Sequence, residues 1–443
     1  MDQVESRIIE ILNQQRLRII DFAEDIFAHP ELGFKEERTA EKVAVELKKL
    51  GLPVRQGLAI TGLKAYLNRN CDGNSDDEQL TVAVIGELDA VRSPYHPNSD
   101  PISKAAHACG HHAQLAALFG AAIALSDPEV SRSLDGNVIF FAVPAEEYGE
   151  IEFKKSLREK GLIEFLGGKA ELIRLGEFDE IDIALTHHSS FSDEAKPVVV
   201  GSGSTNGFIA KRIRYIGKEA HAAGGPHEGI NALNAALIGL NALNAQRETF
   251  KDDDAVRIHP ILTKGGDLVN VIPGEAIIEL LVRARTLEAI LDANAKATRS
   301  FEAGAYAIGA QVEINDFPGY LPRVPESISS PITAIAKRVV GADRVWEVDP
   351  KVHNAFSSDV GDVSHILPVF SFTTGGTTGE SHAANFRIVD PEMAYIVPAK
   401  IMALTVYDML KNSAANAKRL KTNYQPRLTR EQYVQYLNSV LKS

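Results

Sequence analysis

The sequence predicts an α/β protein in which helices cover a central, mostly parallel sheet, with a smaller α+β domain inserted into it. Continuous β-branched runs at residues 80–88 and 137–143 have the composition of strands buried on both faces, and a helical pattern at 113–125 lies between them. The inserted domain is predicted by a β-α-β-β-α-β order of patterns between residues 208 and 317, which is the order of a ferredoxin-like module.

Apolar residues at helical spacing predict that two helices open the chain, over residues 4–27 and 36–50, with a turn-rich connection at 29–34. A polar surface loop is expected at 68–78, and a third strand at 181–185. The inserted domain is expected to contain strands at 208–216, 256–263, 276–283 and 311–317 and helices at 231–247 and 287–308. The expected domain bounds are residues 1–204 and 319–443 for the larger domain, and 205–318 for the inserted domain.

Length and composition indicate a globular protein of two or three domains, because 443 residues with 44% apolar and 24% charged residues can bury a large core. A net charge of −12 disfavours nucleic acid as a partner. The two cysteines, Cys71 and Cys109, lie in different surroundings, so we expect both to be free or metal-bound in a reducing compartment. No secretory signal and no membrane span are expected, which predicts a cytoplasmic protein.

The strongest local signal for chemistry is the run of residues 107–112, His-Ala-Cys-Gly-His-His, directly before a predicted helix. The Cys109 thiolate and the His111 imidazole are two residues apart and can point at one metal ion, since Gly110 lets the backbone bend between them. For this motif alone, a buried cysteine beside surface histidines is an equally good interpretation.

Further candidate ligands follow predicted strands. Glu146 and Glu147 come after the strand at 137–143, so one can bind metal while the other serves as general base and then as acid to a leaving amine. His187 and His188 end the strand at 181–185, and His382 lies in a Gly-rich loop. Each histidine alone is more often structural. Taken together, the Cys-Gly-His motif, the glutamate pair and the histidines occur at three strand ends and in one Gly-rich loop, which favours a metal site.

Six motifs occur in an order that resembles the zinc-dependent aminoacylase and carboxypeptidase family, in the branch of hippurate, indole-acetyl-amino-acid and p-aminobenzoyl-glutamate hydrolases. They are His-Pro-Glu-Leu-Gly-Phe at 29–34, Gly-Glu-Leu-Asp-Ala at 86–90, His-Ala-Cys-Gly-His at 107–111, Pro-Ala-Glu-Glu at 144–147, Gly-Lys-Glu-Ala-His-Ala at 217–222 and Asn-Val-Ile-Pro at 270–273. Together they span nearly the whole chain.

The resemblance implies one or two divalent ions per subunit, zinc, manganese or cobalt, with Glu146 as the general base. The implied ligands are Cys109, His111, Glu147, His188 and His382. His188 is preferred to His187 because its spacing from Asp182 along the chain matches that of the family, and either histidine could be the ligand. Asp89 is implied to be a carboxylate that orients a ligand histidine.

The resemblance implies that the larger domain is the metal-binding catalytic domain and that the inserted domain serves as a lid and in dimerisation. It also implies that His221 of the inserted domain reaches the site of a partner subunit and holds the developing oxyanion, which predicts a homodimer or a larger oligomer built from dimers. Asn270 and Arg283 match positions that line the same cleft, as candidates for binding the scissile carbonyl and the substrate carboxylate. Arg283 at a strand end is equally compatible with simple solvation. His112 departs from the family, since many relatives have aspartate there, and this predicts reduced charge near the metals.

The leading hypothesis is hydrolysis of the amide bond of an N-acyl or N-aroyl amino acid, a small substrate that carries a carboxylate. The second is metal-dependent removal of an amino group from an aromatic amine such as a nitroanthranilate, which His112 and an altered metal set would accompany. The third, a non-catalytic binding protein on the same fold, is the weakest, because Glu146 and all proposed ligands are intact.

Overall fold

The computed structural model describes residues 1–69, 79–189, 197–326 and 330–441. The chain divides into two compact units. Unit 1 comprises residues 1–203, 325–352 and 363–430, and unit 2 comprises residues 204–324, 353–362 and 431–443. The segments 353–362 and 431–443 thus join the inserted stretch, whereas the sequence predicted one contiguous insertion. Cys71 and most of the predicted loop at 68–78 lie outside the described residues.

Unit 1 is built on an eight-stranded sheet with the order β1-β2-β6-β3-β7-β16-β8-β14. The four central strands, β6, β3, β7 and β16, run parallel, whereas β1, β2 and β8 pair antiparallel to their neighbours towards the centre. The strands are β1 (Val54–Leu58), β2 (Gly62–Leu67), β3 (Thr81–Glu87), β6 (Asn137–Val143), β7 (Ile183–Ser189), β8 (Val198–Val200), β14 (Val345–Glu347) and β16 (Val369–Thr374). The predicted mostly parallel central sheet is confirmed.

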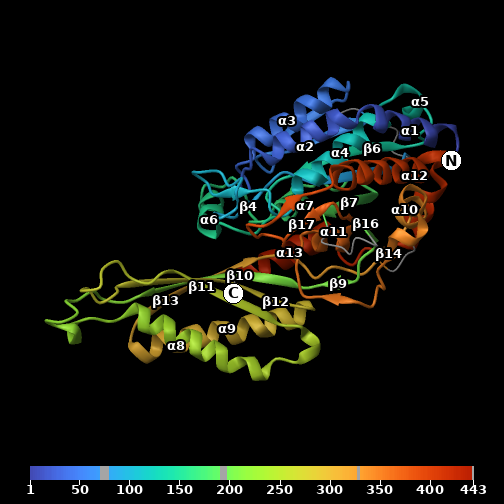
Figure 1. Cartoon of the computed structure of the whole chain (residues 1–443). Coiled ribbons are helices and arrows are strands. Elements are labelled where there is room, and N and C mark those ends of the chain that lie inside the picture. Colours follow the sequence, from blue (N-terminus) through green and yellow to red (C-terminus); the bar gives the residue numbers. More distant parts are fainter. Residues whose placement is uncertain (70–78, 190–196, 327–329, 442–443) are drawn as a thin grey trace. The chain divides into compact units, whose positions relative to one another are not determined.

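Helices α3 (Glu37–Lys49), α4 (His111–Leu125), α10 (Ile332–Val340) and α12 (Val397–Asn423) contact strands of this sheet (Figure 1). Helices α1 (Gln3–Gln14), α2 (Arg16–Phe27) and α5 (Pro128–Ser131) pack against α4. The unit also contains α6 (Ile151–Glu159) and α7 (Gly168–Arg174), and α11 (Val360–Ile366) begins in unit 2 and ends in unit 1. Every residue of α4 is buried, because α1, α2 and α12 cover the helix on the side away from β3. A helix buried on all sides has no polar face, which explains its nearly continuous apolar sequence.

One apolar helical stretch, Glu392–Asn423, is long enough to cross a membrane, with a mean hydropathy of 1.3 in its most apolar window. That window is 89% buried within the structure, as expected of a core helix. Its residues pack with α4 in the main hydrophobic cluster of unit 1.

The prediction of one helix over residues 4–27 was wrong. The chain forms two helices, α1 and α2, which meet at Gln15, where the backbone leaves the helical region at φ −89° and ψ 6°. No glycine or proline marks the break. Each half buries its own apolar face, Ile8 and Leu12 in α1 and Ile19 and Phe22 in α2, so tertiary packing overrides the local preference for one helix.

Unit 2 contains a four-stranded antiparallel sheet with the order β11-β12-β10-β13, covered on one face by α8 and α9, which lie side by side (Figure 1). The elements are β10 (Gly207–Ile216), α8 (Ala232–Ala245), β11 (Arg257–Lys264), β12 (Glu275–Ala284), α9 (Leu287–Ile308) and β13 (Gln311–Pro318). Their order along the chain is the predicted β-α-β-β-α-β order of a ferredoxin-like module. Shorter elements elsewhere are β4 (Val91–Arg92), β5 (Ala105–Ala106), β9 (Ser204–Thr205), β15 (His353–Asn354), β17 (Thr377–Thr378), β18 (Arg387–Ile388) and α13 (Arg430–Leu441).

The parallel centre of the sheet brings three strand ends to one edge. Glu87 at the end of β3 pairs with Val143 at the end of β6, and Ile85 pairs with Thr186 in β7. Residues that follow these strands therefore lie close together, as is usual where an α/β protein builds its site. The turn after β6 is packed tightly against α7, because a Cβ on Gly168 would lie 1.6 Å from the Pro144 carbonyl oxygen.

Candidate metal centre

The backbone at Gly110 places Cys109 and His111 at the edge formed by the strand ends. Gly110 has φ 94°, and a Cβ there would lie 2.5 Å from Ser189 Oγ at the end of β7. Glycine therefore lets the chain approach β7 closely and then turn into α4, which begins at His111. The thiol of Cys109 and the ring of His111 are both buried.

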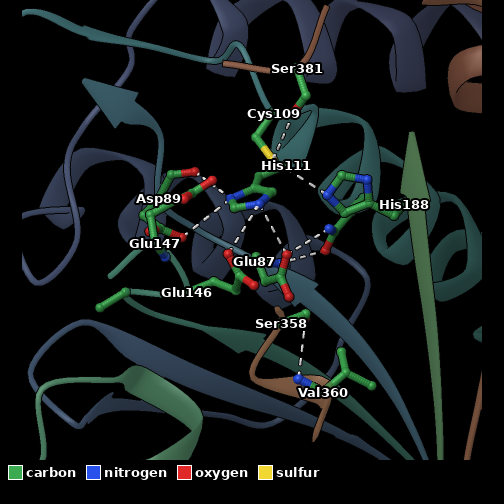
Figure 2. Close-up of polar contacts among 12 residues, drawn as sticks. Glu87, Asp89, Cys109, His111, Glu146, Glu147, His188, Ser358, Val360 and Ser381 are labelled. Carbon is green, nitrogen blue, oxygen red and sulfur yellow. Dashed lines mark hydrogen bonds and ion pairs between the residues drawn. The ribbon is translucent and has the colours of Figure 1, made fainter. Parts of the chain in front are cut away.

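The His111 ring is oriented by Asp89 (Figure 2). Its Nδ1 lies 2.8 Å from the Asp89 carbonyl oxygen and 3.3 Å from Asp89 Oδ1, so Nδ1 carries a proton and donates. The other oxygen of the carboxylate, Oδ2, accepts a hydrogen bond from the Glu147 backbone N–H at 2.9 Å. His111 Nε2 is therefore turned towards the cluster, the arrangement expected of a metal-ligating histidine.

The Cys109 thiol lies between two further histidines. Its Sγ is 3.5 Å from His188 Nε2 and 3.3 Å from His382 Nε2. His188 donates from Nδ1 to the Ser189 carbonyl oxygen at 2.8 Å, which leaves its Nε2 facing the sulfur. His382 Nε2 also lies 3.0 Å from Glu147 Oε1.

These side chains form three groups in which all donor atoms lie within 4.8 Å of one another. The groups are Cys109 with His111 and His188, Cys109 with Glu147 and His382, and Glu87 with His111 and Glu146. Donors at about 2.0–2.3 Å around a tetrahedral ion lie roughly 3.3–3.8 Å apart, close to the separations at Cys109. The buried His111 Nε2 forms no hydrogen bond with any described residue. The residues present therefore fit one or two divalent cations.

The ionisable groups of the cluster shift one another's pKa values towards a thiolate and protonated imidazoles. Burial and the charge of Glu147 would raise the pKa of the Cys109 thiol, yet His111 and His188 hold it well below its usual value. Hydrogen bonds to Cys109 and Glu147 raise the pKa of His382 to about 11. Without a cation, a thiolate and protonated imidazoles thus neutralise one another. A bound cation replaces the protons.

The turn that carries Glu146 and Glu147 is strained and supported from outside. Ala145 has φ 49°, a conformation rare for a residue with a side chain. Its backbone N–H donates to the buried Glu36 carboxylate at 2.8 Å, and Thr61 Oγ1 donates to the same carboxylate at 2.6 Å. Glu146 Oε2 lies 3.9 Å from His111 Nε2, which places the carboxylate at the edge of the cluster.

His187 and His112 point away from the cluster. His187 Nε2 lies 2.8 Å from Thr374 Oγ1, so of the two adjacent histidines the structure brings His188 to Cys109. His112 is fully buried beside the rings of His107, Phe27 and Tyr395. Burial, and then the charge of His111, lower the pKa of His112 to about 3, so the ring is neutral.

The predicted residues of unit 2 fall into two places. His221 lies beside Asn270, since His221 forms a β-bridge with Val271 and Asn270 accepts from the Ala222 N–H at 3.0 Å. This loop pair lies at the end of the sheet where β12 begins. Arg283 lies near the other end of β12, and at about 3.3 Å per residue the strand separates the two places by more than about 25 Å.

Three residues at this edge were not predicted from the sequence. They are Glu87, Lys169 and Gln114, and all three are buried. The side chains of Lys169 and Gln114 donate hydrogen bonds to the Glu87 carboxylate. Glu87 belongs to the motif at 86–90 and follows the same strand-end rule as Glu147, so a signal for it was present. Lys169 carries no comparable signal.

The donor groups around Cys109 and His111 fit divalent metal ions at the strand ends of an α/β sheet. The sequence profile of Peptidase family M20/M25/M40 matches residues 83–407, and the chain belongs to this family. Its enzymatic class is that of metal-dependent amidohydrolases, which act on carbon–nitrogen bonds, as the sequence predicted.

Relatives of known name include a Xaa-Arg dipeptidase from Mus musculus, 28% identical over 344 residues, or 75% of this chain and 70% of that protein. A p-aminobenzoyl-glutamate hydrolase chain from Escherichia coli is 28% identical over 292 residues, or 64% of this chain and 54% of that protein.

Two solved structures show the same fold. An aminobenzoyl-glutamate utilization protein from Klebsiella pneumoniae has a TM-score of 0.66 at 18% identity, with coverage of 91% of this chain and 98% of that chain. A dinuclear metal-binding M20 peptidase from Bacillus subtilis has a TM-score of 0.61 at 22% identity, with coverage of 90% of this chain and 99% of that chain.

Substitutions at the cluster are expected to remove metal from the purified protein. Cys109→Ser and His111→Ala each delete a donor that belongs to two of the three groups, so both variants should retain less metal than wild type by elemental analysis. His187→Ala is the matched control, because this buried histidine faces Thr374 and should keep the wild-type metal content. Unchanged metal content in both cluster variants would contradict the assignment.

Metal binding is expected to release protons and to weaken as the pH falls. With a pKa of about 11, His382 is protonated at neutral pH in the metal-free protein, whereas an imidazole nitrogen that binds a cation must be deprotonated. Calorimetric titration of chelator-treated protein with zinc, in two buffers of different ionisation enthalpy, measures this release. Equal heats in the two buffers would show that no proton leaves.

Proposed function

We propose that this protein hydrolyses the amide bond of an N-acyl or N-aroyl amino acid. The observation that carries the proposal is the convergence of Cys109, His111 and His188 with Glu147 and His382, beside the carboxylate of Glu146. Relatives named for cleaving a dipeptide and p-aminobenzoyl-glutamate support an amide as the scissile bond.

The proposed ligands are Cys109, His111 and His188 for one divalent ion and Cys109, Glu147 and His382 for a second. When bound, such ions supply Lewis acidity and lower the pKa of water. Thiolate, imidazole and carboxylate donors suit zinc, and also manganese or cobalt. We also propose a cytoplasmic location, because a reducing compartment protects a thiolate ligand from oxidation.

Glu146 is the proposed proton carrier. One carboxylate oxygen accepts a proton from the attacking water, and the same carboxyl group then gives it to the nitrogen of the departing amine. Asp89 keeps the adjacent Glu147 in place through the Glu147 backbone N–H, so the two glutamates have separate tasks.

His221 is the proposed donor to the oxygen of the scissile carbonyl. Its Nδ1 accepts hydrogen bonds from the backbone N–H groups of Ala223 and Gly224 at 3.2 and 2.9 Å. A neutral ring whose Nδ1 accepts carries its proton on Nε2, and His221 is exposed. The ring is therefore prepared to donate to a developing oxyanion, with Asn270 beside it.

Arg283 is the proposed partner of the substrate carboxylate. Since Arg283 and the pair His221 and Asn270 lie near opposite ends of β12, one copy of unit 2 cannot present all three to one substrate. In a dimer, one copy can supply Arg283 to a site while the other copy supplies His221 and Asn270. This agrees with the role that the family resemblance gives to a histidine of the partner subunit. We therefore propose a homodimer with shared sites.

The aromatic-amine alternative is less favoured. It depended on His112 altering the metal set, but His112 lies among aromatic rings and faces away from the proposed ligands. The relatives described above are named for dipeptide and aroyl-glutamate cleavage, which gives the removal of an aryl amino group no support.

Assay of the zinc- or manganese-loaded protein on N-acyl amino acids, N-aroyl amino acids, dipeptides and aminobenzoates tests the proposal. Release of a free amino acid supports it, whereas ammonia released from aminobenzoates alone would overturn it. Glu146→Gln should keep its metal and lose about 10²–10⁴-fold in kcat, because the proton carrier is gone. Glu159→Gln, on the exposed face of α6, is the control and should keep the wild-type rate.

Mixing two inactive variants tests the shared site. In a dimer of His221→Ala with Glu146→Gln, one of the two sites contains both native residues, so the mixture should regain about a quarter of the wild-type activity on random exchange of subunits. If exchange is demonstrated by mass spectrometry and the mixture stays inactive, or if a monomer reaches the full rate, the shared site is wrong.

A further inference from the structure

The proposed function leaves one buried network at the metal edge without a role. Glu87 is the last residue of β3 and is 2% exposed, and Lys169 in α7 is completely buried. Lys169 Nζ donates to Glu87 Oε1 at 2.6 Å. Gln114 in α4 donates to Oε2 at 2.6 Å, and its own oxygen accepts from the Glu87 backbone N–H at 3.2 Å. Both carboxylate oxygens are therefore held in fixed positions.

Glu87 Oε2 also faces the metal-binding nitrogen of His111, 3.2 Å away (Figure 2). Without a cation, this separation is that of an ion pair between the carboxylate and a protonated imidazole. Because Nδ1 donates to Asp89, Nε2 is the ring nitrogen left for a cation. A cation that takes the place of the Nε2 proton lies within reach of both atoms.

The separation suits a shared cation. Two donors bound to one zinc ion at about 2.0–2.1 Å in tetrahedral geometry lie roughly 3.3 Å apart. Glu146 Oε2 lies 3.9 Å from the same His111 nitrogen, and the donor atoms of Glu87, His111 and Glu146 all lie within 4.8 Å of one another. The ion bound by His111 can therefore be reached from Glu87.

We propose that Glu87 Oε2 binds the same divalent cation as His111 Nε2, so that Glu87 is a metal ligand in addition to the five residues of the proposed function. Lys169 acts as its counter-charge through the other carboxylate oxygen. This proposal rests on metal binding by His111, which the proposed function already requires.

The pairing with Lys169 gives the buried Glu87 carboxylate a counter-charge on the oxygen that faces away from His111. A buried carboxylate without a partner would take up a proton or destabilise the fold before any metal arrived. Lys169 neutralises it without occupying Oε2, and Gln114 keeps that oxygen turned towards His111. Glu87 is thus ionised and oriented in the metal-free protein.

A crystal structure of the zinc-loaded wild-type protein, with anomalous data at the zinc edge, tests the proposal directly. We expect Glu87 Oε2 at about 2.0–2.2 Å from the ion on His111. If His111 binds an ion and Glu87 Oε2 lies more than 3 Å from it, the proposal is wrong while the proposed function stands. If no ion is bound at His111, both are wrong.

Variants provide a second measurement that does not depend on activity. Chelator competition should show that Glu87→Gln weakens zinc binding at one site by more than about 10-fold and leaves the other site in place. Glu171→Gln is the matched control: Glu171 is 1% exposed and pairs with Arg174 on the same helix as Lys169, so its loss should leave zinc affinity unchanged. Wild-type affinity at both sites of Glu87→Gln would overturn the proposal.

Lys169→Met tests whether Lys169 acts as the counter-charge of Glu87 or serves packing alone. The variant leaves the Glu87 carboxylate without its counter-charge, and a bound cation can supply that charge instead. Its unfolding temperature should therefore fall more in the metal-free protein than in the zinc-loaded protein. An equal fall in both forms would show that Lys169 serves packing alone and would overturn its role as the counter-charge.

Discussion

The hydrogen bond from His111 Nδ1 to the Asp89 carbonyl oxygen is the contact on which the candidate metal centre depends. It joins the segment after β3 to the first residue of α4, and the Asp89 carboxylate joins both to Glu147 after β6. One residue therefore sets the directions of donors from three elements. Because Nδ1 is occupied, Nε2 can only face the cluster, and the proposed ligands and Glu87 are arranged around that nitrogen.

The turn after β6 keeps a strained backbone conformation because buried side chains support it. Ala145 holds an unfavourable backbone conformation, and the buried Glu36 carboxylate compensates by accepting its N–H. Burial, and then the charge of Asp89, raise the pKa of Glu36 to about 7, so this support is itself sensitive to charge nearby. Lys154, also buried, donates to the Glu147 carbonyl oxygen at 2.7 Å. The turn is thus shaped by partners that take no part in the chemistry.

Much of this arrangement could be predicted from the sequence, because parallel strands place their carboxyl ends at one edge and the strands themselves are clear in the pattern. The pairs at 146–147 and 187–188 follow from that rule, whereas the choice within each pair came from the family resemblance. The order of elements in unit 2 is also clear in the pattern. The break at Gln15 could not be predicted, since it results from the packing of two helix faces. Lys169 was missed because its burial depends on a partner 82 residues earlier in the chain. The separation of Arg283 from Asn270 follows from the length of β12, and it was implicit in the strand predicted at 276–283.

The packing of α4 against α12 has a consequence for how the chain is made. Helix α4 is buried on every side in the folded protein, yet α12 begins only at Val397, long after α4 ends at Leu125. At about 5–20 residues per second, a ribosome needs roughly 15–50 s to synthesise the intervening segment. During that interval the side of α4 that packs on α12 has no partner in the nascent chain. The connectivity of unit 1 therefore leaves one apolar face of α4 accessible to chaperones that bind exposed apolar segments until α12 is synthesised.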